Sequence, residues 1–143
     1  MNRIKEFKGE HRFLSNFYVS PGEKLSLEHV YQALKTNDKT WQEIIMAAQT
    51  PVEAKQFGRQ APLRPDWEGI KVNIMHSLVY AKFASNEDLK KRLLNTGDAF
   101  LEEGNNWGDT FWGVDLKTGE GQNFLGDILM TVRNEIKIKE AAN

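Results

Sequence analysis

A carboxylate and an amine share one face of a short helix that the sequence predicts near its N-terminal end. Ser26 is a typical helix N-cap, and no Gly or Pro interrupts the nine residues after it. On that helix Glu28 and Lys35 lie two turns apart, roughly 10 Å along the axis, and point the same way. This separation is too long for a direct ion pair, but it suits two groups that line one pocket from opposite ends. An ordinary solvated face, with an acid favoured by the helix dipole, is the alternative.

Carboxylate, amine and tryptophan side chains together suit cleavage of an N-glycosidic bond between a base and a ribose. Such cleavage needs a proton for the departing nitrogen and a group that meets the anomeric carbon. Two carboxylates can achieve this through direct attack by water, or an unprotonated lysine can form an imine with the ring-opened ribose. The imine route requires burial or a nearby cation that lowers the pKa of the lysine. The hypothetical pocket contains Glu28, Lys35, Trp107, Asp109, Trp112 and Asn123.

Within this pocket we favour Glu28 as the acid/base and Lys35 as the amine. Lys71 is the second candidate amine, because it lies beside the apolar stripe of a later helix. The role of Asp109 depends on its backbone: in an extended segment it shares a face with two aromatic residues, whereas after Gly108 it can cap a turn. Tryptophan rings would hold a planar base by stacking, worth roughly 1–3 kcal/mol per base.

The elements that must position these residues are mostly helices, which makes the fold α+β and helix-dominated. Leu27, Val30 and Leu34 form the expected buried stripe of the first helix. Thr50-Pro51-x-Glu53 predicts the start of another helix, and Gly58 is expected to end it. Helices are expected over residues 27–35, 41–49 and 51–58, after Asp66, from Ser85 to Asn95 and from Asn123. Short strands are expected at residues 4–7, 99–103 and 110–116, with a strand or an ordered loop at 13–19.

Several polar residues outside this helix have binding potential. Asn16 stands between aromatic residues, and buried polar groups need partners. Arg59 and Arg64 flank a Pro-containing connection; such arginines are usually solvated, but arginine is also the residue that holds a pyrophosphate. Gly121-x-Asn123-x-x-Gly126 resembles the start of a helix that binds an anion through free backbone N–H groups.

The composition is typical of one globular domain, residues 1–143, with a net charge near zero. The 19 Lys and Arg residues nearly balance the 20 Asp and Glu residues, so no basic field favours non-specific nucleic-acid binding. The chain has no cysteine, and His11, His29 and His76 lack the spacing of metal ligands. We therefore expect no metal and no cofactor. The N-terminal segment lacks an apolar core, so we expect a cytoplasmic protein with no membrane contact and no obligate protein partner.

Five ordered blocks resemble the NADAR (YbiA-like) N-glycosidase family over about residues 10 to 135. They are Phe13-Leu-Ser-Asn16-Phe-Tyr18 with Glu28-His29-x-x-Gln32-Ala33-x-Lys35; Gly58-Arg59; Leu63-Arg64-Pro65-Asp66-Trp67 with Lys71 and Met75; Asn106-Trp107-x-Asp109-x-x-Trp112-Gly113; and Gly121-x-Asn123-x-Leu125-Gly126 with Leu129-Met130 and Arg133. Any one block alone would be weak, but five in order are specific.

The resemblance implies hydrolysis of an N-glycosidic bond in a ribose phosphate. The substrate is either ADP-ribosylated guanine, in nucleotides or in DNA, or an early intermediate of the riboflavin pathway, and we favour the first. Single-stranded or flipped-out DNA could present the modified base. The expected catalytic residues are Glu28, Lys35 and Asp109. The expected substrate-binding residues are Asn16, Phe17, Tyr18, Gln32, Arg59, Arg64, Trp67, Lys71, Trp107, Trp112 and Asn123.

Two hypotheses belong to other classes, and the first of them uses the same arginines, tryptophans and Asn123. A non-catalytic module that binds ADP-ribose or a nucleotide would keep its affinity after Glu28→Gln. A structural or partner-binding domain would show no shift in melting temperature with these ligands. The presence of Glu28 and Lys35 on one helix face favours the enzyme.

Overall fold

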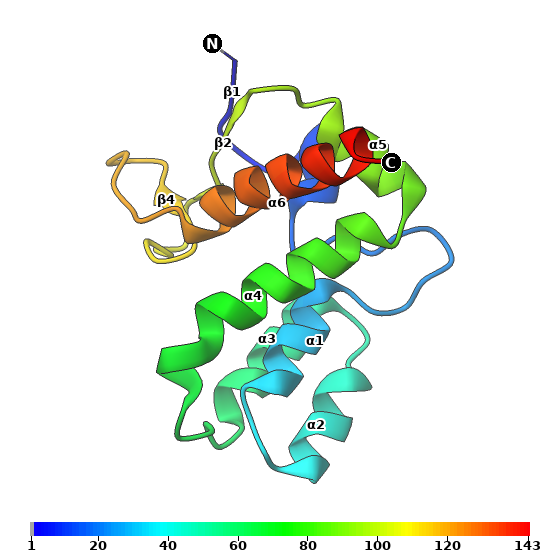
Figure 1. The fold of residues 1–143 in the computed structure, drawn as a ribbon. Helices are drawn as coiled ribbons and strands as arrows, with labels where there is room; N and C mark the ends of the chain where they lie inside the picture. The colour runs from blue at the N-terminus through cyan, green and yellow to red at the C-terminus, as the bar shows by residue number, and fades with distance from the viewer. Residues whose placement is uncertain (1) are drawn as a thin grey trace. The chain divides into compact units, whose positions relative to one another are not determined.

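The computed structural model describes residues 2–143 and confirms a helix-dominated α+β fold. Within these residues six α-helices and one short 3-10 helix outweigh four strands of two residues each (Figure 1). In chain order the elements are β1 (Arg3–Ile4), η1 (Gly9–Leu14), α1 (Leu27–Leu34), α2 (Lys39–Met46), α3 (Pro51–Gln60), α4 (Trp67–Ala84), α5 (Glu87–Leu94), β2 (Phe100–Leu101), β3 (Gly104–Asn105), β4 (Val114–Asp115) and α6 (Phe124–Ala141). No helix in the described part of the chain is both long enough and apolar enough to cross a membrane.

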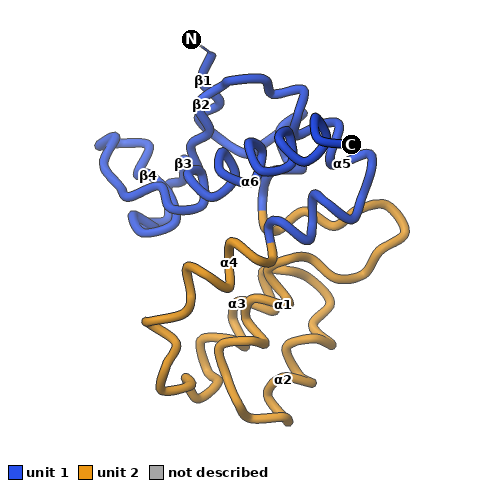
Figure 2. The backbone as a smooth tube through the Cα atoms, viewed as in Figure 1, with its two compact units in different colours: residues 1–15, 79–143 blue, residues 16–78 orange. Residues whose placement is uncertain are grey.

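The chain divides into two compact units, which Figure 2 shows in different colours. One comprises residues 16–78 and is called here the α1–α3 unit. The other comprises residues 1–15 and 79–143 and is called here the α6 unit. The long helix α4 crosses the boundary, so its first twelve residues belong to the α1–α3 unit and its last six to the α6 unit.

In the α1–α3 unit, three helices pack pairwise around a small apolar core (Figure 1). Ala33, Ile45, Ala48 and Ala54 form that core. The start of α1 is fixed by a reciprocal cap, of which the sequence predicts the part made by Ser26. Ser26 Oγ accepts the His29 backbone N–H, and the Ser26 N–H donates to His29 Nδ1. Because Nδ1 accepts, Nε2 carries the proton and donates to the Ala48 carbonyl at 2.9 Å. His29 is therefore a fully buried structural link between α1 and the end of α2.

In the α6 unit, the start of helix α6 is anchored on strand β2 by one side chain. Asn123 adopts a left-handed backbone with φ 53°. Its Nδ2 donates to the Leu101 carbonyl at 2.9 Å, and its Oδ1 accepts the Glu103 N–H at 3.0 Å. Gly126 completes this approach, because a Cβ there would collide with the Leu101 carbonyl oxygen. Short parallel pairings join β1 to β2 and β3 to β4.

All six expected helices are present, and the differences lie at their ends and in one loop. The second begins at Lys39 because Asp38 caps it, and it stops at Met46. The fifth is capped by Asn86. Gly58 does not end the third helix, which continues to Gln60. Residues 13 and 14 end a 3-10 helix that begins at Gly9, and residues 15–19 form a turn and loop, so the loop alternative holds there and the strand alternative is wrong.

The buried face of α1 was predicted wrongly. Leu27, Val30 and Leu34, the expected buried stripe, are only half-buried. Glu28 and Gln32 are buried instead, with 6% and 4% of their surface exposed. This inversion is possible because the two polar side chains hydrogen-bond each other, which reduces the cost of removing them from water.

The Asn123 anchor predicts an ordered series of destabilised variants. Asn123→Ala leaves Leu101 and Glu103 without their partners and forces alanine into a left-handed backbone, so we expect a loss of about 3 kcal/mol in unfolding free energy. Asn123→Gly loses the same hydrogen bonds without the backbone strain and should lose about 1 kcal/mol less. Urea denaturation measures both. Unchanged stability in either variant would contradict the anchor.

Candidate active site

The centre of the candidate site is the polar face of α1. Gln32 Nε2 donates to Glu28 Oε2 at 3.0 Å, and both side chains are buried. The Glu28 backbone N–H donates to the carbonyl of Asn16 at 3.0 Å, so the first predicted binding loop lies directly against the start of the helix. Lys35, the C-cap residue, is half-buried at the other end. The structure thus brings four of the predicted site residues together in the α1–α3 unit.

The environment of Lys35 favours its neutral amine. Burial, the largest cause, lowers the pKa of Lys35 below its ordinary value. The carboxylate of Glu28 raises this pKa, whereas the positive charges of Arg59 and Lys55 on α3 lower it. The balance is a lowered pKa, in the direction that imine formation requires. The predicted amine therefore has both features demanded of it, partial burial and neighbouring cations.

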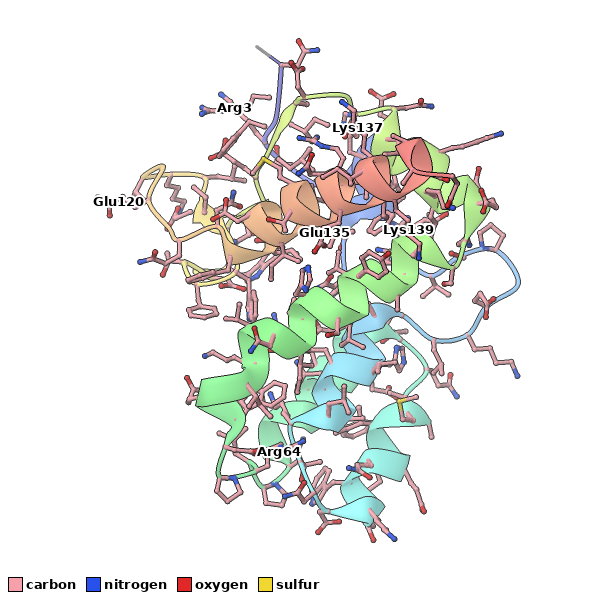
Figure 3. All side chains as sticks on the ribbon, viewed as in Figure 1. Arg3, Arg64, Glu120, Glu135, Lys137 and Lys139 are labelled. Atoms are coloured by element: carbon pink, nitrogen blue, oxygen red, sulfur yellow. The ribbon has the colours of Figure 1, made fainter. Side chains whose placement is uncertain are left out.

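The two candidate arginines, Arg59 and Arg64, differ in their contacts and exposure. Arg64, labelled in Figure 3 in the connection between α3 and α4, donates to both carboxylate oxygens of Asp66 and to the Leu34 carbonyl. The hydrogen bond that Arg64 donates to the Asp66 carboxylate raises the pKa of Arg64. Its guanidinium thus ties the end of α1 to the turn before α4. Arg59 is exposed on α3 and exerts its charge on Lys35, so it is the better candidate for a phosphate.

The remaining predicted residues of the α1–α3 unit have mixed surroundings. The Asn16 amide donates to the sulfur of Met75 at 3.5 Å, a weak partner for a buried amide. Phe17 lies 5.7 Å from the amine of Lys55, and Tyr18 is half-buried. Trp67 is only 4% exposed and its ring centroid lies 5.1 Å from that of Tyr31, which makes it part of the packed interior. Lys71 is ion-paired with Glu68 at 2.7 Å.

In the α6 unit, one buried amide that sequence reasoning missed organises the loop that carries Trp107 and Asp109. Asn105 is 1% exposed. Its Oδ1 accepts the N–H groups of Trp107 and Asp109, and its Nδ2 donates to the carbonyl of Asp109 and to the Glu103 carboxylate. The available signal was a short polar residue just ahead of Gly108, a composition typical of side-chain-stabilised turns.

The turn alternative for Asp109 is confirmed, and the extended alternative is wrong. Asp109 Oδ1 accepts the N–H groups of Phe111 and Trp112 at 3.1 and 2.9 Å. Trp107 lies on this fixed loop and is 58% exposed. Trp112 is half-buried in an aromatic cluster with Phe111 and Phe124.

The anion site expected at the start of α6 is not formed. The N–H groups of four consecutive residues, 122 to 125, donate to the carbonyls of residues 110 to 113. These are the groups that a phosphate would need, so the backbone has already used them. Asn123 is likewise engaged through both amide atoms. Its expected contact with substrate stays a prediction.

Lys82 is a third amine of interest, which the sequence did not reveal. Its Nζ donates to the Ser15 carbonyl at 2.9 Å within the α6 unit. Burial lowers the pKa of Lys82 to about 7. A lysine in a helix carries no local signal of such burial, because the segments that surround it are distant in the sequence.

The predicted site residues thus fall into two groups, one in each unit. Glu28, Gln32, Lys35, Arg59 and the loop at residues 16–18 belong to the α1–α3 unit. Trp107, Asp109, Trp112 and Asn123 belong to the α6 unit. The single pocket that joins both groups stays a prediction.

The fold and the pair of buried and half-buried residues on α1 can now be compared with known proteins. The NADAR domain matches residues 4–137. This match covers nearly the whole chain, so the protein belongs to the NADAR family. The resemblance noted in the five sequence blocks is therefore confirmed.

Curated relatives and a solved structure agree with the family. The chain is 42% identical to a Nostoc punctiforme protein named N-glycosidase over 78% of this chain and 74% of that protein. It is 36% identical to N-glycosidase YbiA of Escherichia coli over 79% and 71%. The NMR structure of E. coli YbiA superposes with a TM-score of 0.84 at 31% identity, over 100% of this chain and 90% of that one.

A third relative is longer. The chain is 42% identical to a riboflavin biosynthesis protein of Vibrio vulnificus over 89% of its own length. It spans only 36% of that protein. The sequence similarity thus extends to proteins of different length and name.

The buried amine of Lys82 predicts a pH-dependent stability. The folded pKa of about 7 lies below the ordinary value of 10.5, so between these pH values the unfolded chain binds more protons. The free energy of unfolding should therefore rise with pH through this window. As the pH falls toward 7, the cost of burying the neutral Lys82 amine grows and this gain in stability is lost. We expect the unfolding free energy of wild type to rise relative to Lys82→Met between pH 7 and pH 10. A constant difference between the two proteins would contradict the burial of this amine.

Proposed function

We propose that this protein is an N-glycosidase that hydrolyses a base–ribose N-glycosidic bond. The observation that supports this most is the face of α1, where a buried carboxylate, Glu28, accompanies an amine, Lys35, whose pKa is lowered. A charged group is costly to bury, and pKa values shifted by burial and neighbouring charge are concentrated at functional sites. The N-glycosidase names of relatives that the chain covers over 71–74% of their length support the same reaction.

In the mechanism that we propose, Glu28 moves a proton and Lys35 forms the covalent bond. Nζ of Lys35 bonds to C1′ of the ribose, and the bond from C1′ to the base nitrogen breaks. Glu28 takes the proton that the attacking amine loses and passes it to the departing nitrogen. The ribose ring opens to give an imine, and water hydrolyses the imine and frees the lysine. Direct attack by water, with Glu28 as the base, is the alternative route.

We favour ADP-ribosylated guanine as the substrate. It offers a pyrophosphate and two base rings, and the chain offers an exposed guanidinium at Arg59 and an exposed ring at Trp107. Arginine suits phosphate oxygens, and tryptophan suits a planar base. If the substrate is DNA, a single strand that exposes the modified base suits this chain, whose net charge of −1 provides no general attraction to a duplex.

A riboflavin-pathway amino-pyrimidine ribose phosphate is the second candidate substrate. The relatives from Vibrio vulnificus and from Zea mays are named riboflavin biosynthesis proteins. The chain spans only 36% and 19% of them, so their names are weaker support than those of the shorter relatives. Both candidates are N-glycosides of a ribose phosphate, so the same Glu28 and Lys35 chemistry serves either.

The decisive experiment is chromatography of the reaction mixture with each substrate. Wild type is incubated separately with ADP-ribosylated guanosine and with the amino-pyrimidine ribose phosphate, and free base is measured. We expect release from the first, and Glu28→Gln should lower turnover by at least about 100-fold, the usual contribution of a general acid or base. Glu120→Gln, which changes an exposed glutamate labelled in Figure 3, serves as a matched control and should retain turnover.

Each other outcome has a definite meaning. Normal turnover in Glu28→Gln would overturn the assignment of Glu28. Release from the amino-pyrimidine compound alone would select the second substrate. No release from either, with ADP-ribose still raising the melting temperature, would replace the enzyme by a non-catalytic binding module.

A further inference from the structure

Gln32 lies where it can control the state of Glu28. Its Nε2 donates to Glu28 Oε2 at 3.0 Å, and the two residues are one helical turn apart on α1. Both side chains are buried, so water competes little for this hydrogen bond. The bond is donated to one oxygen of the carboxylate, Oε2.

The other end of the Gln32 amide fits a space that only glycine provides. Gly58 is buried in α3, and a Cβ added to it would collide with Oε1 and approach Cδ of Gln32 at 2.7 Å. The Gly58 backbone is not left-handed, so the need for glycine comes from this close approach and not from the backbone angle. A glycine inside a helix lowers helix stability by about 1 kcal/mol relative to alanine. Helix α3 has this less favourable residue at position 58.

The orientation of the amide points to an ionised Glu28. Among residues 2–143, Oε1 of Gln32 is buried without a hydrogen-bond partner and faces Gly58. The amide therefore directs its donor, Nε2, toward Glu28 and its acceptor toward a C–H group, which is at most a weak donor. A hydrogen bond donated to Oε2 stabilises the charged carboxylate more than the neutral acid, so this orientation favours an ionised Glu28.

We propose that Gln32 is a positioning residue that holds Glu28 in its ionised, proton-accepting form, and that Gly58 provides the space in which Gln32 can do so. In the reaction, Glu28 would then first accept a proton from the attacking group and only afterwards donate it to the departing nitrogen. This refines the role of Glu28 and rests on the proposed N-glycosidase function. It also gives Gln32 a different task from the substrate contact that the sequence predicts.

Other charges act on Lys35, the electrostatic partner of Glu28, and must be held constant in a test. Lys35 on α1 interacts electrostatically with Glu28, and α3 carries Lys55 and Arg59 close to Lys35. The loop that contacts the Glu28 backbone, residues 16–18, contributes no charged side chain at neutral pH. Variants of Gln32 and Gly58 leave all three cations in place, so they isolate the effect of the amide.

The direct test is the titration of the Glu28 carboxyl, followed by carbon-13 NMR of uniformly labelled protein. The Glu28 signal is assigned by its loss in Glu28→Gln. Gln32→Met keeps the approximate volume of the side chain but removes the donor, so we expect the titration midpoint of Glu28 to move to higher pH. A midpoint that is unchanged in Gln32→Met would overturn the proposal, whether or not the protein turns over a substrate.

A second variant pair tests the role of Gly58. Gly58→Ala should displace the Gln32 amide and raise the same midpoint, and it should lower the melting temperature. Gly69→Ala is the matched control, because Gly69 lies in the first turn of α4 with no atom within 4 Å of an added Cβ. We expect Gly69→Ala to leave the midpoint unchanged and to raise the melting temperature slightly. A Glu28 midpoint that moves equally in both variants would contradict the specific role of Gly58.

Kinetics separate this proposal from the function on which it rests. With an active wild type, Gln32→Met should lower kcat by about 10-fold or more and shift the acidic limb of the kcat profile to higher pH. A substrate-binding role alone would instead raise KM and leave the acidic limb in place, which would overturn the positioning role. If wild type releases no base, the proposed function fails, and the NMR titration still decides the role of Gln32.

Discussion

A carboxylate can be buried in this fold because an amide one turn away donates to it, and much of the candidate site depends on that pair. Glu28 and Gln32 take the interior positions of α1 that the apolar stripe was expected to occupy. Without the donor, burial would favour the protonated acid and remove the negative charge that acts on Lys35. The Glu28–Gln32 pair therefore links the packing of α1 to the ionisation of the groups that would perform the chemistry.

Helix α3 supports the same site in two ways. Gly58 allows close contact with Gln32, and the next residue, Arg59, contributes a positive charge that lowers the pKa of Lys35. The sequence Gly58-Arg59 thus combines a steric and an electrostatic role in two adjacent positions. Lys35 is held between opposing influences, since Glu28 favours its charged form while burial and the cations of α3 favour its neutral form.

The sequence predicted the features that depend on local chemistry. Ser26 and Thr50 were recognisable as caps because a short side chain satisfies N–H groups two or three residues away, and both act so in the structure. The predictions from sequence were wrong where contacts with a distant segment determine the local structure. Gly58 was predicted to end α3, but in the structure it lies inside the helix, where the side chain of Gln32, 26 residues earlier, packs against it. The start of α6 was predicted to bind an anion, but its N–H groups already donate to the carbonyls of residues 110–113. The catalytic and binding assignments themselves stay predictions, because packing alone does not report a reaction.

Borohydride trapping followed by peptide mapping would show whether Lys35, at the end of α1, is the reacting amine. Borohydride reduces an imine to a stable amine, so the modified lysine retains the mass of the ribosyl group. We expect an adduct on Lys35 during turnover of ADP-ribosylated guanosine, and no adduct in Lys35→Ala. An adduct on Lys71 or Lys82, or release of base with no adduct on any lysine of wild type, would contradict this expectation.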